Sequence, residues 1–324
     1  MRIVALAGGI GGARFLRGLL AVTPSSEITV IGNTGDDISL YGLRVCPDLD
    51  TVMYTLGGGI NEEQGWGRQK ESYVVKEELA AYGVEPQWFG LGDRDFATHI
   101  VRTQMIDAGY PLSAVTEALC ARWEPGVRLI PMSDDRTETH VVISDEQGRR
   151  AVHFQEWWVR LRASVPAEQI ILVGADEAKP APGVLQAIAD ADVVILPPSN
   201  PVVSIGTILQ IKGIREALEA KTVVGVSPII GGAPVRGMAD ACLTAIGVDT
   251  TAQAVLELYG SPLMDGWLVA EEDAGTALDG VLVEARPLIM HDVESAGAIA
   301  QAALDLATEI AARRGTAPQG EDAR

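Results

Sequence analysis

The sequence is poor in cysteine and in aromatic residues, and each shortage excludes a class of protein. Its three cysteines, Cys46, Cys120 and Cys242, lie far apart and form no C-x-x-C pair. Neither a disulfide framework nor a zinc cluster is therefore expected, and a cytoplasmic location is predicted. Aromatic residues make up only 5% of the chain, against 35 glycines, which is more typical of a turn-rich α/β enzyme than of an all-β sandwich.

Positive charge and long apolar runs are also scarce. The formal net charge is −19, and because nucleic-acid binding requires a basic face, no nucleic-acid partner is expected. The chain has no run of about 18 apolar residues, so no membrane-spanning segment is predicted. The apolar start, residues 1–7, is too short for a signal peptide. A small phosphate ligand is still compatible with the acidic charge, because glycine amides, a few arginines and a metal ion can hold one.

What the chain does contain is an alternation of short β-branched runs and helical patterns. The predicted strands of the main sheet span 2–7, 28–31, 170–173, 193–196, 222–226, 267–270 and 281–284. The predicted helices lie near 13–21, 182–191, 206–220, 238–246, 251–259 and 294–313. This order predicts an α/β fold with a Rossmann-like, doubly wound, mostly parallel sheet. We expect one domain over 1–312, with a helical insertion at about 62–126, a β-hairpin at about 139–155 and a disordered tail over 313–324.

Glycines follow the first predicted strand, at Gly8, Gly9, Gly11 and Gly12. Backbone N–H groups at such a turn can approach a phosphate, and the start of the next helix favours negative charge. The dinucleotide fingerprint G-x-G-x-x-G fails, because Arg14 stands at the third glycine position, and no Walker Lys-Ser or Lys-Thr follows. The alternative is a tight βα turn without a ligand. We predict phosphate binding at Gly9, Gly11 and Gly12.

Acidic residues cluster after the second strand, at Asp36, Asp37, Asp48 and Asp50. Carboxylates in loops at the carboxyl ends of parallel strands suit a hard cation such as Mg²⁺. Each could instead cap a helix or close a turn. Four aspartates within a short stretch, all expected in loops, favour an acidic site.

Arginines and neutral polar residues stand at further strand ends and turns. Arg94 and Arg136 are candidates for recognition of phosphate or carboxylate, with surface ion pairs as the alternative. Loops after later strands carry Ser199, Asn200 and Gly231. Because such loops from both halves of the sheet converge on one edge, they indicate an enzyme site.

Several of these strings, in this order, resemble the 2-phospho-L-lactate transferase family. They are the glycine turn with residues 13–16, Gly35-Asp36-Asp37, and the segments 45–51, 91–95, 134–140, 198–204 and 227–231. The resemblance spans residues 2 to about 290, and the stretches 46–59 and 153–160 are similar to the actinobacterial, phosphoenolpyruvyl-transferring branch. The chain departs from that branch at residues 24–26, where the link from helix to strand is short.

The resemblance implies a Rossmann-like, commonly dimeric enzyme of coenzyme F-420 synthesis that requires Mg²⁺. Such an enzyme transfers an enolpyruvyl-phosphate or lactyl-phosphate group from a guanosine diphosphate adduct to the deazaflavin precursor 7,8-didemethyl-8-hydroxy-5-deazariboflavin, and releases GMP. Carried onto this chain, it implies metal binding by Asp36, Asp37 and Asp50, and a catalytic role for Asp50, Asp37 and Arg94. Nucleotide or phosphate contacts are implied for Gly9, Gly11, Gly12, Arg136, Ser199, Asn200 and Gly231. Two alternatives stay open from the residues alone, an NAD-dependent oxidoreductase and a nucleotide-sugar-binding regulator.

Overall fold

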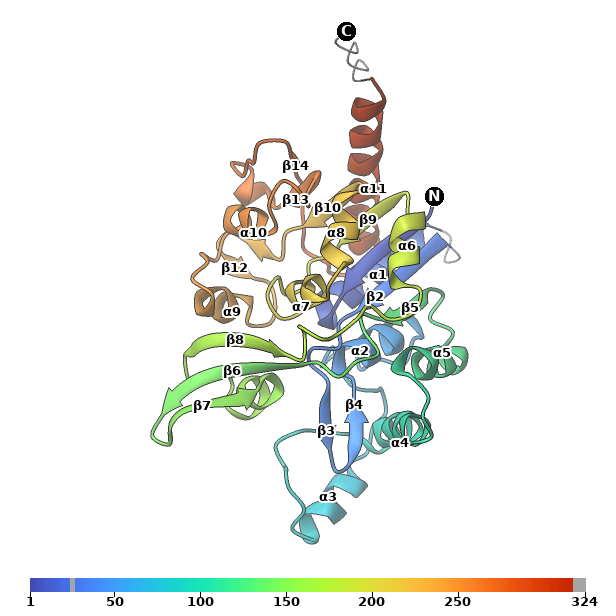
Figure 1. Cartoon of the computed structure of the whole chain (residues 1–324), viewed down its shortest axis with the longest axis vertical. Helices are drawn as coiled ribbons and strands as arrows, with labels where there is room; N and C mark the ends of the chain where they lie inside the picture. Colours follow the sequence, from blue (N-terminus) through green and yellow to red (C-terminus); the bar gives the residue numbers. More distant parts are fainter. Residues whose placement is uncertain (24–26, 317–324) are drawn as a thin grey trace.

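A parallel β-sheet forms the centre of the molecule (Figure 1). In the computed structural model, which describes residues 1–23 and 27–316, this sheet has seven strands in the order β14-β13-β10-β9-β1-β2-β5, all parallel. The strands are β1 (Ile3–Ala7), β2 (Ile28–Gly32), β5 (Arg128–Pro131), β9 (Val193–Leu196), β10 (Val223–Val226), β13 (Gly266–Val269) and β14 (Leu282–Ala285). The predicted α/β fold with a doubly wound parallel sheet is confirmed. The short link at 24–26 and the end of the predicted tail, 317–324, lie outside the described residues.

The inner strands are continuous apolar runs because both faces of the sheet are covered. Every residue of β1, β9, β10 and β13 is buried. In β1, Ile3 lies opposite Ile28 of β2 on one side and Val193 of β9 on the other. The strand order reverses between β1 and β9, since the chain builds outward from β1 to β5 and then adds β9 to β14 on the opposite side. Doubly wound sheets bind ligands at such a point, outside the carboxyl ends of the strands.

Helices cover the two faces of the sheet. One layer, α1, α2, α5 and α11, shares a core with one face, and α6 to α10 share a core with the other. Their bounds are α1 (Gly9–Val22), α2 (Pro47–Leu56), α5 (Leu112–Trp123), α6 (Val184–Asp190), α7 (Ile205–Gln210), α8 (Ile214–Glu219), α9 (Ala239–Ala245), α10 (Ala252–Tyr259) and α11 (Val293–Thr316). The predicted helix at 206–220 is two helices, because Gly213 with φ +91° separates α7 from α8.

The chain between the small antiparallel pair β3 (Ile38–Leu40) and β4 (Leu43–Val45) and strand β5 is mostly helical. After α2 it contains α3 (Val74–Ala81), α4 (Asp93–Asp107) and α5, in the range of the predicted insertion. β3 and β4 share an apolar cluster with residues at the start of α4. Helix α3, described along its whole length, buries none of its residues and lies at the end of the molecule opposite α11 (Figure 1).

A separate three-stranded antiparallel sheet contains the predicted hairpin. Its strands are β6 (Glu138–Asp145), β7 (Gly148–His153) and β8 (Ala167–Val173), in the order β7-β6-β8. The prediction that residues 170–173 form a strand of the parallel sheet is wrong, because β8 pairs antiparallel with β6. Only Leu172 of β8 is buried, as befits an edge strand, so its apolar sequence gave a misleading signal. The true parallel strand, β5, begins with an exposed arginine and was not predicted.

Two boundaries matter for the site. The glycine segment, predicted as a loop, is the first turn of α1, which begins at Gly9. Asp48 and Asp50, also predicted in loops, lie in the first turn of α2 and are buried.

The last helix, α11, continues to Thr316, past residue 313, where the predicted disordered tail begins.

The short elements that complete the described chain are β11 (Ile229–Ile230), β12 (Ala233–Pro234), a π-helical turn η2 (Glu156–Arg160) and a 3₁₀ turn η3 (Glu271–Asp273). Among the helices of the described residues, none has the length and apolar character needed to cross a membrane.

Candidate active site

A cleft of about 670 Å³ opens at the carboxyl ends of the parallel strands. Its walls come from the segments that follow β1, β2, β9 and β10, from the insertion and from the η2 turn. It therefore lies where the strand order reverses, as the fold class predicts. Of the predicted site residues, those that line it are Gly9, Gly11, Asp36, Asp50, Ser199 and Asn200, and those that do not are Gly12, Asp37, Arg94, Arg136 and Gly231.

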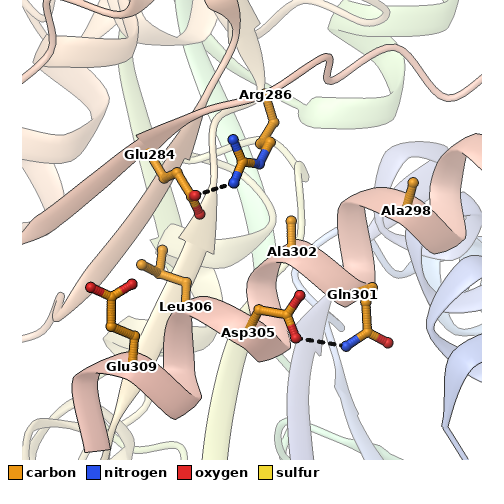
Figure 2. Close-up of a pocket in the computed structure, with 8 residues that line it drawn as sticks. All are labelled: Glu284, Arg286, Ala298, Gln301, Ala302, Asp305, Leu306 and Glu309. Carbon is orange, nitrogen blue, oxygen red and sulfur yellow. Dashed lines mark hydrogen bonds and ion pairs between the residues drawn. The ribbon is translucent and has the colours of Figure 1, made fainter. Parts of the chain in front are cut away.

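A second hollow, of about 390 Å³, lies between β14 and α11 (Figure 2). Four of its polar side chains are paired, since Arg286 binds Glu284, and Gln301 donates to Asp305 at 2.8 Å. None of the predicted site residues, all of which the structure describes, lines this hollow. The cleft at the strand ends is therefore the candidate active site.

The first turn of α1 is packed against the segment that follows β9, and glycine is required there. A Cβ on Gly11 would clash with the Pro198 carbonyl oxygen, and one on Gly12 would lie 2.5 Å from Ser199 Oγ. The Ser199 hydroxyl donates to the Gly8 carbonyl oxygen at 2.9 Å and accepts from Gly8 N–H at 3.4 Å. The turn is thus tied to β9 on one side and open to the cleft at Gly9 and Gly11 on the other, where a helix N-terminus favours an anion.

Asp36 and Asp48 form a buried carboxylate pair at the cleft. Asn33 donates to Asp48 Oδ2 at 2.8 Å, and Gln155 donates to Asp36 Oδ2 at 3.4 Å. Burial, followed by the charges of Asp48 and Asp37, raises the pKa of Asp36 well above its ordinary value, and burial raises that of Asp48 to about 6. Asp36 Oδ1 is buried without a hydrogen-bond partner, and within residues 1–23 and 27–316 neither carboxylate has a basic partner.

Asp37, by contrast, is held by an arginine beneath the cleft. Its Oδ2 accepts from Arg44 Nη2 at 2.9 Å and from the Cys46 thiol at 3.0 Å, and its side chain is fully buried. Burial raises the pKa of Asp37, and the Arg44 charge offsets part of this effect. Asp37 is therefore already paired with a cation of the protein, the Arg44 guanidinium.

The charge of Asp50 is likewise balanced by an arginine, Arg102. Its Oδ1 accepts from the buried Arg102 guanidinium, while its Oδ2 has no hydrogen-bond partner and lies 3.7 Å from His99 Nδ1. Burial lowers the pKa of His99 to about 4, so that ring is neutral near pH 7. The predicted trio Asp36, Asp37 and Asp50 is not assembled as one ligand set, because no group of three or more metal-ligating side chains occurs in the described chain.

The remaining predicted residues lie at the surface or serve the backbone. Arg94 is exposed and its Nε donates to the Lys70 carbonyl at 3.0 Å. Arg136 is 61% exposed and pairs with Glu138 at 2.5 Å. Other backbone roles are those of Gly231, whose N–H donates to Asp273, and Asn200, whose Oδ1 accepts from the N–H groups of Val202 and Val203. Their predicted ligand contacts stay predictions.

Several cleft residues are not among the predicted site residues. Asp95, in the first turn of α4, accepts from Tyr54 Oη at 2.8 Å, and burial together with the Asp50 charge raises its pKa to about 7. Arg14, Trp66, Trp158 and Arg236 also line the cleft. Asp95 and Arg14 lie in two of the segments that resemble the family, and this resemblance is what could have indicated a role for them in the site.

Comparisons with known proteins agree on one family. A family model described as 2-phospho-L-lactate transferase CofD matches residues 3–303. Proteins named phosphoenolpyruvate transferase are 71% identical over 322 residues in Thermobifida fusca and 69% identical over 318 residues in Streptomyces griseus, covering 97% and 96% of this chain and all of each relative. A protein of the same name from Mycolicibacterium smegmatis is 59% identical over 324 residues, covering 95% of this chain and 99% of that protein. A crystal structure of a UPF0052 family member from Bacillus halodurans superposes with a TM-score of 0.61 at 19% identity, covering 94% of this chain and 98% of that one, which shows the fold alone.

Proposed function

Because the chain belongs to the 2-phospho-L-lactate transferase CofD family and is therefore a transferase, we propose that it moves an enolpyruvyl-phosphate group from a guanosine diphosphate adduct to the deazaflavin precursor of coenzyme F-420. Relatives named phosphoenolpyruvate transferase favour enolpyruvyl over the lactyl group. The observation that carries the proposal is the cleft at the strand reversal, which joins a glycine turn to a carboxylate pair without a basic partner in the described chain. Membership in a transferase family also favours this reaction over the oxidoreductase and regulator alternatives.

The same carboxylate pair fits a magnesium ion. Mg²⁺ in phosphate-handling sites takes one or two carboxylates plus water and phosphate oxygens, which matches two neighbouring carboxylates better than a cage of three. Asp36 Oδ1 is buried and unpaired, so a cation there would satisfy it. We therefore assign the metal to Asp36 and Asp48, rather than to Asp36, Asp37 and Asp50. When bound, the ion would neutralise phosphate oxygens of the donor.

The protein's own groups then position the two substrates. The start of α1 at Gly11 binds the diphosphate, while the Gly9 N–H holds the Asp48 carboxylate, and Asp50 and Asp95 line the part of the cleft assigned to the deazaflavin. The ribityl hydroxyl oxygen attacks the β-phosphorus, the bond from that phosphorus to the GMP oxygen breaks, and GMP leaves. The hydroxyl proton passes to a carboxylate, for which Asp95 is suited because its pKa of about 7 lets it accept and release a proton near neutral pH. Asp50 orients the hydroxyl through its free Oδ2.

Product analysis tests this function directly. Purified protein is incubated with the deazaflavin, Mg²⁺ and either the enolpyruvyl or the lactyl adduct. The mass of the product is measured by mass spectrometry, and the released GMP is quantified. We expect one GMP per product, faster turnover of the enolpyruvyl adduct, and loss of turnover in excess EDTA. Full turnover in EDTA would contradict the metal assignment. Transfer of the lactyl group alone would contradict the donor assignment.

We also propose that the protein is a homodimer, as the family resemblance implies. Sedimentation velocity at micromolar concentration is expected to give twice the mass of the 34.3 kDa chain. A single species of monomer mass would contradict it.

A further inference from the structure

Three segments meet at one side of the cleft, and two arginines come together there. Ile10 and Arg14 stand one turn apart on α1 and so share a face of that helix. A Cβ on Gly65, in the turn after α2, would lie 3.1 Å from Ile10 Cδ1 and 3.1 Å from Arg236 Nη1. The Arg236 guanidinium comes from the loop before α9. It therefore lies near the first turns of α1, beside the glycine turn.

The protein balances the charges of these two arginines only in part, since Glu62 offsets some of the shift in the pKa of Arg14 without forming an ion pair with it. Burial, followed by the charge of Arg236, lowers the pKa of Arg14. The nearby acid Glu62 is held by Arg17, at 2.5 Å. Over residues 1–23 and 27–316, neither Arg14 nor Arg236 makes a hydrogen bond or an ion pair. Two facing, unpaired cations in a chain of net charge −19 disfavour each other, and an anion bound between them would offset that repulsion.

The donor carries two kinds of anionic group. Its diphosphate already has partners in the glycine turn and in the metal proposed at Asp36 and Asp48. Its remaining anion is the carboxylate of the three-carbon acid, a planar group that guanidinium side chains bind through paired hydrogen bonds. We propose that Arg14 and Arg236 together bind this carboxylate and so select a donor that carries an acid. This inference rests on the proposed function and specifies its donor subsite.

Two donor analogues, one with the carboxylate and one without it, distinguish binding of the carboxylate from binding of the phosphates. One is the mixed anhydride of GMP with 2-carboxyethylphosphonate, and the other is its match with propylphosphonate, which lacks the carboxylate. Calorimetry in Mg²⁺ measures both against wild type, Arg14→Gln, Arg236→Gln and Arg236→Lys. Arg149→Gln is the matched control, because Arg149 is an exposed arginine that pairs with Glu168 on the three-stranded sheet. Melting temperatures verify that each variant is folded.

Wild type is expected to bind the carboxylate analogue roughly tenfold more tightly than the propyl analogue. Either Gln variant should remove this preference by weakening only the carboxylate analogue, Arg236→Lys should restore part of it, and the control should keep it. Equal weakening of both analogues would assign the arginines to phosphate and overturn the inference, as would a wild type without preference. Failure of the proposed function is distinct, because wild type would then bind neither analogue and would not turn over the deazaflavin.

Discussion

Of the four buried aspartates at positions 36, 37, 48 and 50, two, Asp37 and Asp50, are bound by arginines that the fold supplies. The other two, Asp36 and Asp48, have no basic partner in the described chain, and their raised pKa values record the cost of holding them charged. An uncompensated buried charge lowers the stability of the folded state. Keeping such a pair charged is costly unless a cation binds it, so the stability of this site should depend on pH and on magnesium.

Asp48→Asn is expected to stabilise the metal-free protein at pH 8 while it removes activity. A carboxyl whose folded pKa is about 6, above its ordinary 3.8, binds more protons in the folded than in the unfolded state between these values, so stability is lost as pH rises through that window. The neutral amide escapes this loss. We expect a melting temperature higher by roughly 3–6 °C at pH 8 in EDTA, and almost no gain at pH 4.

Calorimetric melting from pH 4 to pH 8 checks this prediction, with the exposed Asp279→Asn as the control that should show no pH-dependent gain. A lower melting temperature of Asp48→Asn at pH 8 would show that the hydrogen bond from Asn33 outweighs the charge. Magnesium affinity of the wild type should rise over pH 5 to 7, because the ion binds the deprotonated pair.

Asp50→Ala is expected to damage the fold, because it leaves Arg102 buried and unpaired. Removing one partner of a buried ion pair costs about 3–5 kcal/mol. Asp50→Ala with Arg102→Met removes both charges and should recover most of that stability. If Asp50 also orients the hydroxyl, the double variant stays inactive although folded. Urea denaturation and product assays on both variants separate the roles, and a folded, active double variant would make Asp50 purely structural.

At the scale of elements, the first turn of α2 divides its two aspartates between two tasks. Residues two apart on a helix point in different directions. Asp48 therefore faces Asn33 and the carboxylate pair, while Asp50 faces Arg102 of α4. One short helix thus joins the side of the cleft where a metal is proposed to the insertion, where the deazaflavin is proposed to bind.

The contact between α1 and the segment after β9 makes Gly11 a test of the glycine turn. In Gly11→Ala the new Cβ meets the Pro198 carbonyl, a backbone atom that cannot rotate away, so the turn must shift. We expect GDP binding weaker by roughly tenfold and a stability loss of about 1–3 kcal/mol, with a smaller change in deazaflavin binding. Calorimetry with both ligands measures the difference.

Gly275→Ala is the matched control, since its Cβ would meet nothing within 4 Å. Unchanged GDP affinity in Gly11→Ala would show that the turn serves packing alone, and equal loss of both ligands would show general damage.

The elements also show what a sequence can and cannot reveal. The parallel strands were predictable because β1, β2 and β9 are short runs of mostly apolar residues that end at or just before glycine or proline. The apolar sequence of β8 led to a wrong placement in the parallel sheet, because an exposed edge strand can carry the same residues as a buried one. The aspartates were predictable as a cluster, but their division was not, because Arg44 and Arg102 reach them from other elements and no local pattern encodes those pairs. Arg236 was predictable as part of a strand-end loop on the ligand side of the sheet, but its position beside α1 was not, since only folding brings the two together.

At the scale of the molecule, the cleft joins the parallel sheet to the insertion and to the η2 turn, so the two substrates should protect different parts of the chain. Amide hydrogen exchange with GDP and Mg²⁺ is expected to slow at 8–14 and 198–204, while the deazaflavin slows exchange at 64–67 and 89–95. Mass spectrometry of peptides resolves these segments. Protection of the insertion by GDP alone would reverse the assignment of the two halves.

The contact between the first and last helices has a consequence for how the protein is made. Gly18 of α1 lies so close to Ala296 of α11 that a Cβ there would clash with its backbone, and the two helices share one core. On the ribosome, α1 emerges well before α11, and the two are separated by on the order of 15–50 s of translation. During that interval the apolar face of α1 has no α11 to cover it. A chain cut short before α11 therefore leaves uncovered the helix whose first turn lines the candidate active site, so a truncation far from the cleft in sequence would still disturb it.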